Sequence, residues 1–385
     1  MALADGSQSR YYFAEESTWA TPPSGDYNEI RFTSESLSEG KDSVTSSEIR
    51  QDRQTTDVQQ TQISASGDID FEFTSQTFDD FLAGLLLNDW NAALGLSLSS
   101  VSVTNTDTIE ASAGDFSAVE QGQWIQISGF TNTENNGVFR VASKASDDSS
   151  VTVQYATLVN ETGADITVDG ETLTNGTTRK SFTLEKELSD VSEFFRYPGL
   201  YFNEGSLSLS AGDLLTGSFS AMAQQEEVNM TQTPSNIIAA NTNPITNSTT
   251  HINEIRENGT TSLTVSSLDM SYSNGLRERP AVGLETTQEF GLGQIDLTGS
   301  IEVYFENADL YQRYLDFTDS DVSFQVEDDN GNIYVVTLPE IKYTDGSVEV
   351  SGTEDDIFAS LDFTAFRARD ASVDNNTFRV DRFIG

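Results

Sequence analysis

Residues 62–73, QISASGDIDFEF, alternate apolar and polar side chains along almost their whole length. One parity is apolar and comprises Ile63, Ala65, Ile69, Phe71 and Phe73. The other parity is polar and partly acidic, and comprises Gln62, Ser64, Ser66, Asp68, Asp70 and Glu72. A period of two places successive side chains on opposite faces of a strand. The stretch therefore predicts a β-strand with one apolar face and one acidic face.

The same pattern recurs in residues 294–305, QIDLTGSIEVYF, with Gln, Ile, Gly, Ile and Phe at matching places. The polar parity of this second strand comprises Gln294, Asp296, Thr298, Ser300 and Glu302. Residue 62 aligns with 294, and residue 181 (SFTLEKE) aligns with 323 (SFQVEDD), so the offset falls from 232 to 142. The chain is therefore predicted to repeat one unit, with about 90 additional residues inserted in the first copy.

A helical pattern follows each of these strands. In residues 74–90 the apolar side chains recur at helical spacing, and two aspartates suit the helix N-terminus. Residues 306–317 show a shorter version. The side chains expected to pack these helices on the strands are Phe78, Phe81, Leu82 and Leu85 in the first copy and Leu310, Tyr314 and Leu315 in the second.

Short alternating runs separated by turns such as ENNG (134–137) and DDNG (328–331) indicate a mainly β protein. We expect two tandem β-sandwich or barrel units, each with one short flanking helix, and a small inserted β domain. The expected division is an N-terminal arm (1–31), a first unit (32–94 and 180–223), the insertion (95–179), a connector (224–261), a second unit (262–367) and a C-terminal tail (368–385).

The chain carries 62 acidic and 20 basic residues, a formal charge of -42. This balance argues against a protein that grips nucleic acid, because such proteins use Lys and Arg to displace counterions from phosphates. The absence of cysteine excludes disulfides and thiolate metal sites. The N-terminal residues lack the pattern of a signal peptide, and the longest apolar run, residues 81–87, is far shorter than a membrane span. We expect a soluble protein.

Residues typical of catalytic or metal sites are nearly absent. The single histidine, His251, lies in the polar connector and is expected at the surface. Residues 328–332, DDNGN, lack the later glutamate of a calcium loop, so a hairpin turn is favoured. We predict no enzyme activity, no metal and no cofactor. Four arginines in two similar clusters are interpreted as inter-subunit salt-bridge residues: Arg50, Arg53, Arg277 and Arg279.

Residues 31–86, 274–283, 291–307 and the closing VDRF (380–383) together resemble the major tail tube protein of long-tailed, siphovirus-type bacteriophages. The resemblance implies subunits that join strands edge to edge into rings, and rings that stack into a DNA-conducting tube with an acidic lining. It also implies a virion protein assembled in the host cytoplasm, without membrane contact. Its partners would be copies of itself, the tape measure, tail terminator and baseplate proteins, and viral DNA in transient, non-sequence-specific passage. The insertion departs from the minimal pattern and would decorate the outside.

Two units per chain predict a trimeric ring that imitates six-fold symmetry. The polar parities of both strands are then expected to face the pore, the alternative being that they face bulk solvent. A competing hypothesis is an acidic β-rich surface adhesin or carbohydrate-binding protein, and an acidic hydrolase is a weaker one. The in-phase repeat of one strand face favours the tube, because neither alternative requires it.

Overall fold

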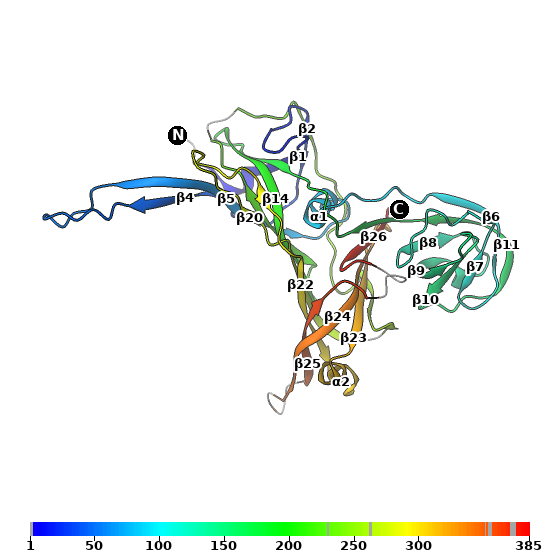
Figure 1. Cartoon of the computed structure of the whole chain (residues 1–385). Helices are drawn as coiled ribbons and strands as arrows, with labels where there is room; N and C mark the ends of the chain where they lie inside the picture. Colours follow the sequence, from blue (N-terminus) through cyan, green and yellow to red (C-terminus); the bar gives the residue numbers. More distant parts are fainter. Residues whose placement is uncertain (1–2, 229–230, 262–263, 351, 353–355, 370–374) are drawn as a thin grey trace.

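The computed structural model describes residues 3–228, 231–261, 264–350, 352, 356–369 and 375–385. Most strands belong to one large sheet system. A closed six-stranded barrel lies on one side of it, and a β-hairpin arm formed by β4 and β5 projects on the other (Figure 1). The predicted fold class, mainly β with two short helices, is confirmed.

The elements before the barrel are η1 (Gly6–Gln8), β1 (Ser9–Glu15), β2 (Asp26–Glu29), β3 (Ser34–Glu35), β4 (Ser38–Thr45), β5 (Val58–Glu72) and α1 (Asp79–Leu86). The barrel contains β6 (Leu96–Val103), β7 (Thr108–Glu110), β8 (Trp124–Ser128), η2 (Thr133–Asn135), β9 (Gly137–Lys144), β10 (Ser150–Gln154) and β11 (Glu161–Asp169). The barrel is followed by β12 (Glu171–Thr174), β13 (Phe182–Leu188), β14 (Glu193–Ser210), β15 (Thr216–Ala223), β16 (Asn236–Ile238), β17 (Ile252–Glu257) and β18 (Thr260–Thr261). The last part comprises β19 (Val265–Ser273), β20 (Arg277–Glu278), β21 (Phe290–Gly291), β22 (Asp296–Tyr304), α2 (Asp309–Asp316), β23 (Asp319–Glu327), β24 (Ile333–Glu349), β25 (Phe358–Ala365) and β26 (Arg379–Phe383).

Two groups of strands are paired in the same order. The first set is β5–β15–β14–β13, and the second set is β22–β25–β24–β23. A helix of eight residues follows the leading strand of each set, α1 after β5 and α2 after β22. Both helices end on a residue in the left-handed conformation, Leu87 (φ 53°) and Phe317 (φ 51°). The strand-then-helix order expected from the sequence is therefore present in both sets.

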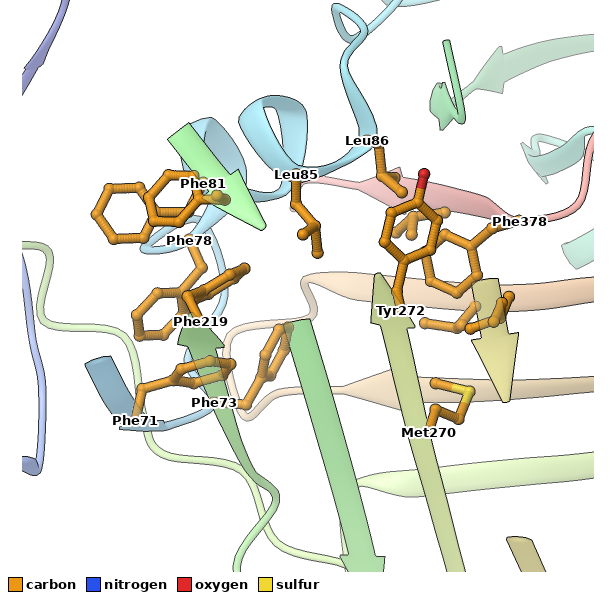
Figure 2. Packing of buried hydrophobic residues seen from close by; sticks show 14 of the residues in the cluster. Phe71, Phe73, Phe78, Phe81, Leu85, Leu86, Phe219, Met270, Tyr272 and Phe378 are labelled. Atoms are coloured by element: carbon orange, nitrogen blue, oxygen red, sulfur yellow. The ribbon is translucent and has the colours of Figure 1, made fainter. Parts of the chain in front are cut away.

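One continuous apolar core joins the two sets (Figure 2). Phe81 of α1 is fully buried among Phe13, Phe202 and Phe219, with ring centroids 4.7, 4.4 and 5.5 Å away. The core continues through Tyr272 and Phe378 into the second set. Burying one such aromatic side chain is worth about 1.5–3 kcal/mol, so this shared core, rather than helix propensity, holds the short helices in place.

The predicted helix-packing residues lie mostly in this core. Phe78, Phe81, Leu85 and Leu310 are buried, and Leu82 and Tyr314 pack partly buried against the core. Leu315 is different, because its side chain is 57% exposed. Leu310, Tyr311 and Tyr314 form the inner face of α2, and Leu315, one residue further on, is rotated about 100° away from it.

The barrel has an apolar core of its own, which includes Val101, Ile125 and Val141. Its two ends meet, since the Leu94 amide donates to the Gly170 carbonyl at 3.0 Å. Trp124 attaches the barrel to the sheet by packing on Val335 and Phe383. Its indole nitrogen also donates to Thr337 Oγ1 at 2.9 Å. Residues 171–174, inside the range expected for the insertion, form β12 and pair with β26 of the large sheet.

Removing the barrel should leave the sheet folded, because the barrel leaves and re-enters it at adjacent points. We expect replacement of residues 95–169 by a short Gly-Ser linker to retain folding and assembly. Stability should fall, because Val335 and Phe383 lose their cover at up to about 1.5–3 kcal/mol each. Replacing residues 95–179 also removes β12 with its buried Leu173, and should prevent folding. Circular dichroism and negative-stain microscopy of both variants check this, and an unfolded 95–169 variant would show that the barrel supports the sheet.

The terminal and connecting segments also enter the sheet. β1 pairs with β13 and buries Tyr11 and Phe13, whereas β26 pairs with β24 and β12. Within the segment expected as connector, β16 pairs with β2, and β17 pairs with β23. β1 therefore extends the first set beyond β13, and β17 extends the second set beyond β23.

The prediction that His251 lies at the surface is wrong, since the side chain is buried at 7% exposure. Its Nδ1 accepts the Asn247 amide at 3.0 Å, and the neighbouring strand β17 pairs with β23. The polar composition around His251 gave no sign of this pairing, in which the Glu327 amide donates to the His251 carbonyl at 2.8 Å.

Candidate functional site

The polar residues of the opening motif lie on one face of an eight-stranded sheet. The strands are ordered β4–β5–β15–β14–β19–β22–β25–β24, all antiparallel. The contact between β14 and β19 joins the two sets into this single sheet. Alternate residues of the central strands point into the core, as the burial of Ile69 in β5, Leu209 in β14, Leu268 in β19, Ile301 in β22 and Leu361 in β25 shows. The intervening residues form the other face, which we call the polar face.

Cross-strand register places acids from different strands in rows, because directly opposed residues share a face. One row of successive partners is Asp68, Ser220, Glu204, Ser273 and Asp296. Another is Glu72, Thr216, Ser208, Asp269, Ser300, Asp362 and Asp345. Serine and threonine hydroxyls separate most of the carboxylates within each row.

The polar face is hollowed near its centre. A groove of about 600 Å³ runs over β14, β19, β22 and β25, and its polar lining includes Ser208, Asp269 and Ser300. The hydroxyls stabilise the acids locally, since Ser360 Oγ donates to Glu302 at 3.2 Å and Ser208 Oγ donates to Asp269. Lys342, which register places opposite Thr364, pairs with Asp319 at 3.0 Å. The surface is therefore acidic and rich in hydroxyls.

Charged groups behind the sheet hold α1 on the core. Arg382 of β26 pairs with both Asp79, at the start of α1, and Glu171 of β12. The Tyr334 hydroxyl donates to Asp79 at 2.8 Å. Burial raises the pKa of Asp79, and the Arg382 guanidinium opposes that shift. These contacts anchor the helix rather than form a reactive site.

The comparison with protein families decides the identity. A family model described as a phage tail tube protein matches residues 6–365, nearly the whole chain. The chain belongs to the phage tail tube protein family. No curated protein matched the sequence. Membership makes this a structural component of the phage tail, and the adhesin hypothesis is not favoured.

The structure of this tail tube protein places the predicted pore-facing residues along β5 and β22. Ser66, Asp68, Asp296 and Thr298 are exposed, and Ser64, Asp70, Glu72, Ser300 and Glu302 are partly exposed. Gln62 lies on the projecting part of β5, opposite Asp42 of β4, and Gln294 lies two residues before the start of β22. Ten of the eleven residues lie on these two strands and Gln294 lies just before β22. That they line a pore remains a prediction.

The sequence reasoning missed the part of the polar face that lies on the other strands. These residues include Glu204, Ser206, Ser208, Asp269, Ser271, Asp362 and Thr364. Their signal is the same alternation, present in residues 205–210 (GSLSLS) and 267–273 (SLDMSYS). The polar parity of these stretches was not singled out from the sequence, because they carry fewer charges than β5.

The four arginines occupy two different settings. Arg50 pairs with Asp52 at 3.1 Å near the tip of the exposed arm, where Arg53 also lies. In the loop between β19 and β22, Arg279 pairs with Glu289 at 3.0 Å, and Arg277 donates to the Leu292 carbonyl at 3.2 Å. Within one chain the side chains of Arg50, Arg277 and Arg279 have local partners, and a role of the four arginines between subunits stays a prediction.

The described residues hold no group of three or more His, Cys, Asp or Glu placed to bind a metal ion. Among the same residues, no helix combines the length and apolar character needed to cross a bilayer.

Proposed function

We propose that three copies of this protein close a ring whose inner wall is the polar face, and that the rings stack into the tube of a long, siphovirus-type tail. The two sets of strands act as fused tube units, so that three chains imitate six-fold symmetry. The observation that carries this proposal is the β14–β19 junction, which joins two similarly ordered sets edge to edge in one sheet.

Sheet geometry favours three copies. Closing n strands spaced about 4.8 Å apart, at a tilt of about 35–45°, gives a backbone diameter of roughly 45–50 Å for 24 strands. Eight strands alone close around an interior filled with side chains. Forty-eight strands would give roughly twice the diameter of 24. Only the intermediate size leaves a channel that encloses a DNA duplex closely.

The acidic wall suits transient passage of DNA. Phosphates bind Lys and Arg through counterion release, whereas carboxylates repel them and keep the duplex from adhering. We propose that the barrel decorates the outside. The tape measure, tail terminator and baseplate proteins would contact the tube, and assembly would take place in the host cytoplasm before the protein enters the virion.

The purified chain should form tubes or rings with a central hole in negative-stain micrographs. Native mass spectrometry should find three chains in the smallest closed species, because each chain contributes two tube units. Six chains per ring would contradict the fused-unit proposal while leaving the tail role intact. A compact monomer at every concentration would contradict self-assembly of the purified protein.

A further inference from the structure

The two sets correspond residue by residue. Residues 204–209 of β14 (EGSLSL) match 345–350 at the end of β24 (DGSVEV), and each follows an irregularity in strand pairing. A side chain at Gly205 would clash with Leu85 of α1, and one at Gly346 would crowd Tyr314 of α2. Both glycines therefore leave room for the helix of their own set.

The strand preceding each set also corresponds. Ser38 of β4 pairs with Ser66 of β5 as Ser271 of β19 pairs with Thr298 of β22, and residues 66 and 298 match in the sequence repeat. β3 and β4 are thus the counterpart of β19. Within the chain, β19 pairs with the second half of β14, with Ser271 opposite Ser206.

The strand segments that correspond to β14 and β19 at this junction, the end of β24 and the strand β4, are free edges. In the described part of the chain, β24 from Asp345 to Glu349 pairs with β25 alone, and β4 pairs with β5 alone. These are the two outermost strands of the eight-stranded sheet (Figure 1). Free sheet edges readily pair with another chain. The internal junction is therefore a template for their pairing.

We propose that the boundary between neighbouring copies reproduces the β14–β19 junction, a refinement that rests on the proposed ring. The β24 edge of one copy pairs antiparallel with β3–β4 of the next. Transferring the internal register sets Asp345 opposite Gly40, Ser347 opposite Ser38, and Val348 opposite Leu37. All eight strands then continue around the ring without a gap.

In the isolated chain the β4 edge is capped at Leu37. The Ser36 amide donates to Asp68 of β5, so the adjacent Leu37 amide and carbonyl point to the open side. The amide donates to the Glu35 carboxylate at 3.0 Å, and the carbonyl accepts the Tyr197 hydroxyl at 3.0 Å. Pairing with β24 exchanges these two bonds for two ladder bonds. The number of hydrogen bonds made by the Leu37 backbone is therefore unchanged by pairing, so the burial of further apolar surface must drive association.

The tip of the projecting β4–β5 arm, residues 46–58, supplies that burial. Its counterpart, the loop 274–295 between β19 and β22, lies folded on the first set. There Glu285 accepts the Ile63 amide at 2.7 Å, and Phe290 packs edge-on against Tyr201. Leu276 of the loop donates its amide to Asn203 at 2.7 Å.

The arm carries the matching apolar residues without a surface to cover them. Ile49-Arg50 corresponds to Leu276-Arg277, and Asp57-Val58 corresponds to Glu289-Phe290. Ile49 is 99% exposed and Val58 55% exposed. The arm therefore docks on the second set of the neighbouring copy, whose Ile295 and Thr344 match Ile63 and Asn203. The partner it fits is a second copy of this chain.

Cysteine pairs test the register, because the natural chain has no cysteine. Ser38 and Ser347 become directly opposed on the polar face, within the Cα separation that a disulfide needs. Oxidising tubes of the S38C/S347C variant should give covalent trimers on denaturing gels. The S36C/S347C control moves one cysteine by two residues, about 6.6 Å along the strand, and should give at least tenfold less product. S206C/S271C should cross-link within single chains and calibrate the reaction.

The arm is tested separately. I49D/V58D should raise the protein concentration needed for assembly about tenfold or more, because two aliphatic side chains lose their burial. V282D, at a fully exposed position of the loop 274–295, should change the protein concentration needed for assembly less than twofold. Tubes without the S38C/S347C product would overturn the pairing while leaving the proposed function standing, and normal assembly of I49D/V58D would overturn the docking of the arm. An unmodified chain that never assembles would contradict the proposed ring itself.

Discussion

Phage particles whose tail tube protein carries lysine at positions 68, 70, 296 and 302 will release their DNA much more slowly at low salt than unmodified particles. Asp68, Asp70, Asp296 and Glu302 lie on the polar face, and their apolar neighbours in β5 and β22 are untouched. The fold and tube assembly are therefore expected to survive. In a trimeric ring, the change introduces twelve cations beside the DNA path.

The size of the effect follows from counterion release. A protein surface with 6–10 phosphate contacts changes its DNA affinity by roughly 10³–10⁵ between 50 and 200 mM salt. A lysine-lined tube should hold DNA strongly at the lower concentration and weakly at the higher one. Release kinetics from particles produced by complementation, followed with a DNA-binding dye at both concentrations, provide the measurement.

A matched control changes the same charge on the barrel. Glu110, Glu134, Asp165 and Asp169 are exposed there, and their replacement by lysine should leave release unaltered if the barrel lies outside the tube. Normal release from the polar-face variant at low salt would show that these acids do not line the DNA path. They would then face bulk solvent.

Replacing Phe81 with alanine is expected to lower the free energy of unfolding of the large sheet by about 3–5 kcal/mol. The side chain is fully buried and contacts the rings of Phe13, Phe202 and Phe219. Truncation removes its burial energy and leaves a cavity that the surrounding strands cannot close. The aromatic contacts account for about 0.5–1.5 kcal/mol of this loss.

Urea unfolding of the full chain measures this effect. Trp90 reports on the region by fluorescence, because its indole nitrogen donates to the Asp79 carbonyl at 3.1 Å. L315A provides the control on the other helix, where the exposed side chain should contribute less than about 0.5 kcal/mol. A loss in F81A as small as that in L315A would show that the core under α1 relaxes around the missing ring.

The strand and helix pattern could be predicted because it depends on neighbouring residues. Alternation in residues 62–73 and 294–305 assigns apolar and polar faces without reference to the rest of the chain, since the backbone geometry of a strand imposes the period. The same holds for the helix at 79–86, whose apolar residues recur at helical spacing. Leu315 shows the limit, because a helix of eight residues leaves its rotation to be decided by the surface on which it packs.

Partners between distant strands were decided only by the tertiary structure. The row from Asp68 to Asp296 crosses five strands, and nothing local to those stretches states which strand lies beside which. Burial of His251 depends in the same way on the chain that returns beside it. The repeat shows this most directly, since the corresponding segments 46–57 and 274–295 differ in structure. The loop folds because the first set lies beneath it in the same chain. The arm stays extended because the eight-stranded sheet ends at β4, and no strand in the described part of the chain lies beyond that edge to cover it.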